Sequence, residues 1–244
     1  MLLYYVRHGD PIYDPDSLTE LGHKQARALS KRMALYGLDE IYASTSVRAT
    51  MTAQPTAERL NKPITPCEWA HEGLVWQDFT VTKSDGTRCW AFHNQTYCDL
   101  FNSDEVIALQ DKWYTHPAFA NDNFASGIAR VHEATDAFMR SLGYEHDRAH
   151  RRYRRIENTK TAAGEEKRIA LFAHQGFGLA FLSSLLDIPY PFFCTHFDIS
   201  HTGVSVIAFA DDGEFVYPKM LQHSNDSHLY KEGLMQGYHG FLNI

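Results

Sequence analysis

The sequence predicts an α/β protein, a three-layer sandwich with a mostly parallel central sheet and helices on both faces. Short, continuous apolar runs such as residues 2–6 and 168–173 are typical of strands that are buried on both faces. Longer segments with apolar residues at helical spacing separate these runs, so strands alternate with helices along the chain. Parallel sheets with crossover helices are built from that alternation.

Length and composition narrow the class of protein. The chain has 244 residues, 44% hydrophobic and 22% charged, which suits one large globular domain or two very small ones. A net charge of −7 argues against a general nucleic-acid binder, and no apolar run is long enough to span a bilayer. The chain begins without a signal-peptide pattern, and its four cysteines form no CxxC pair. We expect a cytoplasmic protein with reduced thiols that binds neither nucleic acid nor membranes; its oligomeric state stays open.

The first helix is expected to follow the strand at residues 2–6 after a turn. Apolar residues recur at helical spacing from 19 to 36, and Gly37 is a suitable stop. Ser17 or Thr19 can cap its N-terminus, because either hydroxyl can accept a hydrogen bond from a free backbone N–H.

Two more strands and a second helix complete the first seventy residues. Residues 40–43 and 63–69 are short apolar strands, and residues 47–60 have the pattern of a helix. Pro55 lies inside that pattern, where it favours a bend or break.

The rest of the chain is less regular at first. Residues 73–125 alternate aromatic and turn residues, with a helix expected at 104–114, and a longer helix is expected at 124–142. The strand at 168–173 is followed by a helix to about 186. We expect a single domain over residues 1–244, with the irregular insertion around 73–125 covering the substrate.

A terminal hairpin is expected near the end of the chain. Residues 204–210 and 214–218 are apolar runs that flank Asp211-Asp212-Gly213, a typical hairpin turn.

Charged and polar side chains follow three of the predicted strands. Arg7 and His8 end the first strand, Arg48 follows the second, and His174 ends the strand near residue 170. In open α/β sheets ligands bind beyond the carboxyl ends of the strands, so these side chains should converge. Guanidinium groups and the free N–H groups of a helix N-terminus bind phosphoryl oxygens. The sequence therefore predicts an anion site.

These segments resemble the histidine phosphatase superfamily, also called phosphoglycerate-mutase-like. The resemblance covers about the first seventy residues and the chain from about residue 168 onward, and four elements in the right order make it specific. The motifs are residues 5–9 (YVRHG), 18–26 (LTELGHKQA), 44–53 (STSVRATMTA) and 171–176 (LFAHQG).

The resemblance implies phosphoryl transfer that uses no cofactor and no metal. His8 is similar to the family's nucleophile, which becomes phosphohistidine. Arg7, Arg48 and His174 resemble the groups that hold the phosphoryl oxygens during transfer. The remaining histidines show no believable metal-ligand spacing.

The family's proton donor is a carboxylate just after the third strand, where this chain offers two. Glu72 fits better because it lies beyond the strand and precedes a glycine, whereas Glu68 is expected within the strand. One departure concerns Asp14, which stands near the place where the family often carries a phosphate-binding Asn. An anionic side chain there would repel phosphate, so a different contact or pocket shape is expected.

The implied activity is that of a cofactor-independent phosphomonoester phosphatase that acts through phosphohistidine on His8, with a small phosphorylated substrate. Two alternatives stay open: a phosphomutase of the same superfamily, and a non-catalytic phosphate-binding scaffold on the same fold. No segment resembles the mutases' substrate-binding stretch. A scaffold would need the cations but no nucleophile.

Two other groups of side chains have a simpler interpretation. The arginine cluster at residues 148–155 is expected to be a solvated face rather than a site that recruits an acidic substrate. Trp76, Phe79, Trp90 and Phe92 are expected to form a small satellite core rather than a substrate cage.

Overall fold

A six-stranded mixed sheet forms the centre of the fold in the computed structural model, which describes residues 1–156, 159–210 and 213–236. Four neighbouring strands are parallel, and the remaining two continue the sheet in antiparallel fashion beyond β1. This arrangement confirms the predicted fold class. The strands, in spatial order, are β13 (Lys219–Asn225), β11 (Val204–Ala208), β1 (Leu2–Arg7), β10 (Arg168–Ala173), β4 (Glu40–Ser44) and β5 (Ile64–Cys67).

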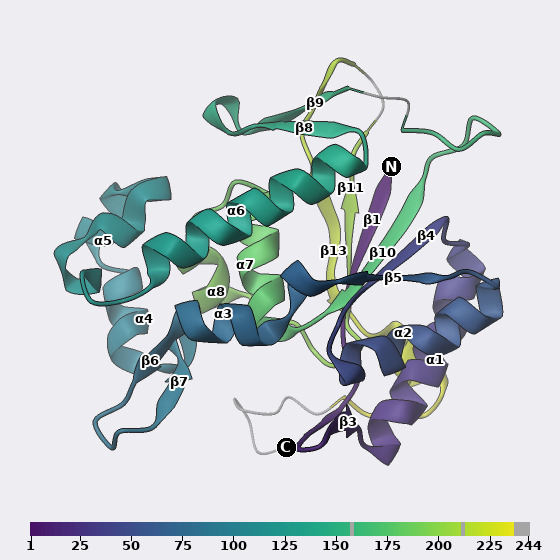
Figure 1. Cartoon of the computed structure of the whole chain (residues 1–244), viewed down its shortest axis with the longest axis horizontal. Coiled ribbons are helices and arrows are strands. Elements are labelled where there is room, and N and C mark those ends of the chain that lie inside the picture. The colour runs from purple at the N-terminus through teal and green to yellow at the C-terminus, as the bar shows by residue number, and fades with distance from the viewer. Residues whose placement is uncertain (157–158, 211–212, 237–244) are drawn as a thin grey trace.

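Helices cover both faces of this sheet, which makes three layers (Figure 1). Helices α1 (Glu20–Tyr36) and α2 (Val47–Leu60) pack on one face. Helices α3 (Glu72–Phe79), α6 (Phe124–Ser141) and α7 (Gln175–Leu185) pack on the other. None of the described helices is long and apolar enough to cross a membrane.

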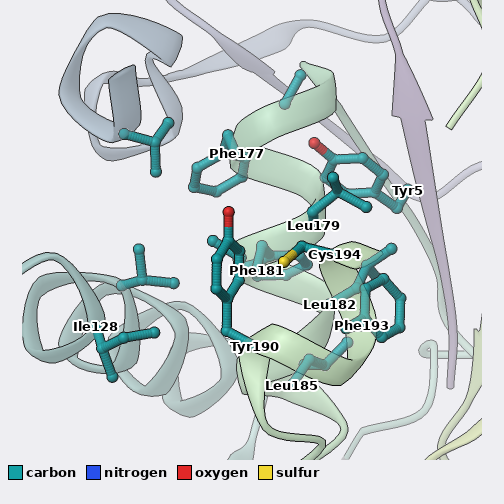
Figure 2. Packing of buried hydrophobic residues seen from close by; sticks show 14 of the residues in the cluster. Tyr5, Ile128, Phe177, Leu179, Phe181, Leu182, Leu185, Tyr190, Phe193 and Cys194 are labelled. Carbon is teal, nitrogen blue, oxygen red and sulfur yellow. The ribbon is translucent and has the colours of Figure 1, made fainter. Parts of the chain in front are cut away.

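The continuous apolar run of β1 follows from this double burial. Tyr4 and Val6 point into the core beneath α1 and α2, whereas Leu3 and Tyr5 point into the core beneath α7. The Tyr5 ring stacks on Phe181 of α7 with ring centroids 5.7 Å apart, and Figure 2 shows it beside that helix. A strand buried on both sides needs apolar residues at every position.

The first two helices begin and end close to the expected residues. Thr19 caps α1, since its hydroxyl oxygen accepts from the Gly22 amide at 3.0 Å, and Gly37 ends the helix with a φ of 69°. Pro55 lies inside α2 without dividing it. The expected break at this proline is therefore absent.

Residues 73–125, expected to be irregular, fold into short helices and a small hairpin. Their buried rings gather around Trp113, which stacks on Tyr190 of α8 (Tyr190–His196) with centroids 5.9 Å apart. Tyr190 belongs to the same buried cluster as Phe181 (Figure 2), so the segment extends the main core. Its further elements are β6 (Thr80–Thr82), β7 (Arg88–Trp90), α4 (Gln95–Phe101), α5 (Asp104–Ala108, shorter than the expected 104–114) and 3-10 turns at Ala91–His93, Gln110–Thr115 and Pro117–Phe119.

The expected terminal hairpin is wrong in its pairing. Strand β11 pairs with β13, whereas residues 215–216 form β12, which pairs with β9 in a separate three-stranded sheet. Val216 is buried in this sheet. That burial favours pairing with β9 over pairing with β11, the strand that precedes it in the sequence. Asp211 and Asp212 of the expected turn lie outside the described residues. The small sheet consists of β12 (Phe215–Val216), β9 (Arg152–Arg155) and β8 (Tyr144–Asp147).

The arginine cluster lies on this small sheet, near the amino end of β1 (Figure 1). Acidic partners neutralise it: Arg148 donates to Asp136 at 2.7 Å, and Arg154 donates to Glu145. Arg148 is partly buried, which corrects the expectation of a fully solvated face, whereas Arg154 is half exposed as expected.

The remaining described elements are small. A hairpin of β2 (Pro11–Tyr13) and β3 (Asp16–Leu18) follows β1, and α9 (Ser227–Lys231) packs beside α1. Further 3-10 turns lie at Glu68–Ala70 and Arg148–His150.

The contact between Gly22 and Asp10 provides a test of the packing. A Cβ at Gly22 would lie 2.2 Å from the Asp10 carbonyl oxygen, so Gly22→Ala must displace backbone. Alanine favours a helix by about 1 kcal/mol, whereas overpacking costs about 1–3 kcal/mol. We expect the free energy of unfolding, from urea denaturation, to fall by about 1 kcal/mol. Leu35→Ala, at an exposed position of the same helix, is the control. A more stable Gly22→Ala protein would contradict the close contact.

Candidate active site

Four of the predicted residues line one pocket beyond the carboxyl ends of the parallel strands. Arg7 and His8 come from the end of β1, Arg48 from the first turn of α2, and Glu72 from the first residue of α3. The pocket has a volume of about 510 Å³, within the range of small-molecule sites. The strand ends thus bring together the residues that the sequence predicted.

His8 is held as a neutral imidazole with its Nε2 lone pair available. Its Nδ1 lies 2.7 Å from the carbonyl oxygen of Gly9, which can only accept, so Nδ1 carries the hydrogen. Burial, followed by the charges of His174 and Arg7, holds the pKa of His8 well below its usual value. A neutral ring with a fixed tautomer can act as a nucleophile through Nε2.

Gly9 lies where two backbone segments approach each other closely. A Cβ there would lie 2.8 Å from the Gly22 carbonyl oxygen of α1. The Gly9 amide also donates to the Thr52 hydroxyl of α2 at 2.9 Å. The glycine therefore serves the close approach of two backbone segments, and the hydrogen bond ties the loop after β1 to α2.

The two arginines differ in their partners. Arg7 is buried and donates to the Ile199 carbonyl, and burial lowers the pKa of its guanidinium group. Arg48 forms an ion pair with Asp16 of β3, with Nη1 and Oδ1 2.8 Å apart. The other Asp16 oxygen accepts from the Val47 amide at the start of α2. The acid that meets Arg48 is thus Asp16, whereas Asp14 lies exposed at the hairpin turn, outside the pocket lining.

His174 is fully buried beside His8, with the two ring centroids 5.2 Å apart. Its Nε2 is 2.8 Å from the Ser44 hydroxyl, and its buried Nδ1 has no hydrogen-bond partner among the described residues. When Ser44 donates to Nε2, Nδ1 carries the ring hydrogen and can donate to a ligand oxygen. The Tyr5 hydroxyl fixes the backbone here, donating to the His174 carbonyl at 2.6 Å.

Glu72 meets the start of α7. Its two carboxylate oxygens accept from the Gly176 and Phe177 amides at 3.0 and 2.9 Å. Burial raises the pKa of Glu72, although these two hydrogen bonds oppose the rise. Its position between the two pocket arginines and a helix N-terminus suits a group that exchanges a proton at the pocket.

Glu68 occupies a different environment. Strand β5 ends at Cys67, so Glu68 starts the following 3-10 turn, and the expectation that it lies within the strand is wrong. Its exposed carboxylate accepts from the Thr45 hydroxyl at 2.8 Å, and it is outside the pocket lining. Of the two candidates, the structure brings Glu72 to His8.

Several pocket residues were missed from the sequence. His71 caps α3 by accepting from the Gly73 amide, and its ring centroid lies 6.3 Å from that of His174. Gln175 lines the pocket beside His174 and donates to Asp198. Both directly flank predicted residues, and that adjacency was the available signal.

The aromatic residues of the inserted segment divide into two groups. Phe79 and Phe92 are buried in the core, as expected, but Trp76 and Trp90 line the pocket together with Tyr13 of the β2–β3 hairpin. The phenylalanines are core residues as expected, but they belong to the main core rather than to a satellite core, and the expectation is wrong for the tryptophans. A helix or hairpin has two faces, and the sequence did not show which one meets the sheet edge.

Comparison with protein families agrees with this geometry. Residues 3–90 match the family model described as "Histidine phosphatase superfamily (branch 1)". The predicted resemblance to this superfamily is therefore confirmed for this part of the chain. Within it lie Arg7, His8, Arg48 and Glu72, whereas His174 lies outside the matched residues. A search of curated proteins found no significant match.

Solved structures of several phosphatases share the fold over nearly the whole chain. A mycobacterial glucosyl-3-phosphoglycerate phosphatase complexed with VO3 is 18% identical with a TM-score of 0.56, covering 91% of this chain and 97% of its own. A mutant phosphoserine phosphatase from Entamoeba histolytica, in complex with phosphoserine, is 18% identical with a TM-score of 0.57, covering 93% and 98%. The alpha-ribazole phosphatase from Shigella flexneri is 18% identical with a TM-score of 0.55, covering 93% and 97%. At these identities the likeness shows the fold.

The neutral state of the buried histidines predicts a pH dependence of stability. The pKa values of His8 and His174 lie well below 6.5 in the folded protein, so below pH 6.5 the unfolded chain binds protons that the folded chain does not. The contribution of these two histidines to the free energy of unfolding is therefore complete above pH 6.5. It decreases as the pH falls toward their pKa values in the folded protein. His146 has a raised pKa and acts in the opposite direction, losing its contribution as pH rises.

Urea denaturation between pH 7.5 and 5 measures this dependence. His8→Asn should flatten the slope below pH 6.5 by up to about 1.4 kcal/mol per pH unit, the effect of one proton. Leu35→Ala, at an exposed position without a titratable group, should leave the slope unchanged. Equal slopes for wild type and His8→Asn would show that His8 is not held neutral.

Proposed function

We propose that this protein is a cofactor-independent phosphomonoester phosphatase that acts through a phosphohistidine intermediate on His8. The observation that carries the proposal is the hydrogen bond from His8 Nδ1 to the Gly9 carbonyl, which leaves Nε2 as a nucleophile beside two arginines. The match of residues 3–90 to the superfamily model and the phosphatases among the structural neighbours support it.

In the first step, His8 Nε2 attacks phosphorus as the bond from phosphorus to the leaving oxygen breaks. Arg7 and Arg48 neutralise the charge that spreads over the remaining phosphoryl oxygens, and the neutral His174 ring donates a hydrogen bond to one of these oxygens through Nδ1. Glu72 gives its proton to the departing alkoxide, which leaves as a neutral alcohol. The Nδ1–H bond to Gly9 then stabilises the positive charge that the phosphorylated ring carries.

In the second step, water attacks the phosphoryl group on His8. The Glu72 carboxylate takes a proton from that water, inorganic phosphate departs, and His8 returns to its neutral form. A carboxyl group whose pKa is raised by burial can hold a proton for the first step and release it before the second.

The partner in this proposal is a small phosphorylated substrate rather than a nucleic acid or a membrane. A mutase on the same site would return the phosphoryl group to an alcohol, so phosphate transfer without release of inorganic phosphate would favour that alternative. Phosphate binding without any phosphohistidine would favour the non-catalytic scaffold.

His8→Ala tests the nucleophile. We expect phosphatase activity on p-nitrophenyl phosphate to fall by about 10³-fold or more, because the variant lacks the imidazole on which the intermediate forms. Wild-type protein quenched during turnover should carry acid-labile, base-stable phosphate, and the variant should carry none. His150→Ala is the matched control. Near-normal turnover by His8→Ala, with an unchanged circular dichroism spectrum, would overturn the mechanism.

Glu72→Gln tests proton transfer through its dependence on the leaving group. Phosphorylation of His8 by an alkyl phosphate should slow by about 10²-fold or more, because an alkoxide needs the proton. With p-nitrophenyl phosphate the first step should slow only mildly, since nitrophenolate leaves as a stable anion. Water activation should then fail, giving one burst of nitrophenol per active site followed by stalled phosphoenzyme.

Glu68→Gln is the matched control for this experiment, because that carboxylate is exposed and bonds Thr45. It should behave as wild type with both esters. Equal losses for both esters in Glu72→Gln, without a burst, would remove Glu72 from the proton-transfer role. Thermal denaturation checks folding, since glutamine can accept only one of the two α7 amides.

A further inference from the structure

Two tryptophans form one wall of the pocket. The rings of Trp76 on α3 and Trp90 on β7 meet edge to face, with centroids 4.9 Å apart and an interplanar angle of 87°. Trp90 is also stacked on the buried Phe92, with centroids 5.5 Å apart and planes at 13°. An indole supported on two sides is a preorganised surface, so little ordering is needed when a ligand packs on it.

This wall lies next to the proposed proton donor. Trp76 follows Glu72 by four residues on α3, so the two side chains share one face of the helix. Trp90 lies against Gly176, where an added Cβ would come within 2.4 Å of the ring, and the Gly176 amide binds the Glu72 carboxylate. The two indoles therefore border the part of the pocket where Glu72 would protonate the leaving oxygen.

Charge in the pocket is placed for the phosphoryl group rather than for the leaving group. Among the described lining residues the only lysine or arginine side chains are Arg7 and Arg48. Arg48 is already paired with Asp16, and Glu72 adds a further carboxyl group. Arg88, on the neighbouring hairpin, is exposed and turned toward the carbonyls of Trp76 and Gln77. A second anionic group on the substrate would lack a cationic partner.

The volume and the lining of the pocket suit a substrate whose alcohol portion contains a ring. A volume of about 510 Å³ holds a phosphoryl group together with a cyclic alcohol portion. Tyr13 supplies a further aromatic surface, since its ring faces the Arg48 guanidinium at 5.4 Å. Aromatic surfaces on the lining favour a planar group that can stack.

We propose that the leaving group of the substrate is an uncharged aromatic alcohol portion that packs on Trp76 and Trp90. This inference rests on the proposed phosphatase function and adds the substrate class. It assigns Trp76 and Trp90 to substrate specificity, a role separate from phosphoryl transfer.

Four phosphate esters of primary alcohols test the proposal on the wild-type protein: benzyl, cyclohexylmethyl, 4-carboxybenzyl and ethyl phosphate. All four leaving groups are alkoxides that need a proton, so differences in kcat/KM report mainly the contacts of the alcohol portion. We expect kcat/KM for benzyl phosphate to be at least about tenfold higher than for ethyl or 4-carboxybenzyl phosphate. It should be about threefold higher than for cyclohexylmethyl phosphate.

The two proposals fail in different ways. If ethyl or 4-carboxybenzyl phosphate is used as well as benzyl phosphate, the leaving-group assignment is overturned and the phosphatase stands. Equal use of the cyclohexylmethyl and benzyl esters would overturn the aromatic part of the assignment. If no ester is hydrolysed and no phosphohistidine forms, the phosphatase function itself is overturned, and this inference with it.

The variant Trp76→Leu tests whether Trp76 produces the preference for an aromatic leaving group. The ratio of kcat/KM for benzyl to ethyl phosphate should shrink at least about fivefold, because leucine keeps apolar surface but removes the ring. Tyr230→Leu, at a residue that is 90% exposed on α9, is the control and should keep the wild-type ratio. An unchanged ratio in Trp76→Leu would overturn its role. If that variant does not fold, the wild-type ester series still decides the proposal.

Discussion

The parallel pairing of β1 with β10 is the constraint on which the candidate site depends. Leu2 faces Arg168 at one end of the ladder and Arg7 faces Ala173 at the other, and the His8 amide continues it by donating to the Ala173 carbonyl. His8 and His174, which lie far apart in the sequence, are thereby brought side by side. A slip of one residue would exchange the two faces of β1, so packing on both sides fixes the register.

Tyr5 carries this constraint into α7. Its hydroxyl accepts from the His174 amide and donates to the His174 carbonyl, so a side chain of β1 holds the backbone of the second histidine. Gly178 makes room for that side chain, since a Cβ there would lie 2.6 Å from the Tyr5 ring. The geometry of the two histidines is therefore set by the core, and the pocket side chains are arranged around a fixed pair.

The sequence predicted the parts of the site that follow from local pattern. His8, Arg48 and His174 stand at strand ends that apolar runs identify, and strand order alone brings strand ends together. Contacts between segments that lie far apart in the sequence could not be predicted from local pattern. The Arg48–Asp16 ion pair depends on how the β2–β3 hairpin folds back on α2, and the division between Trp76 and Phe79 depends on the orientation of α3.

Asp16 has a consequence for how an anion reaches the pocket. Because its carboxylate already neutralises Arg48 and the start of α2, and the chain carries a net charge of −7, little positive field extends into the solvent. Long-range attraction then contributes little to the encounter with a dianion. Under the proposed function, capture at such a site is governed by fit after contact rather than by long-range attraction.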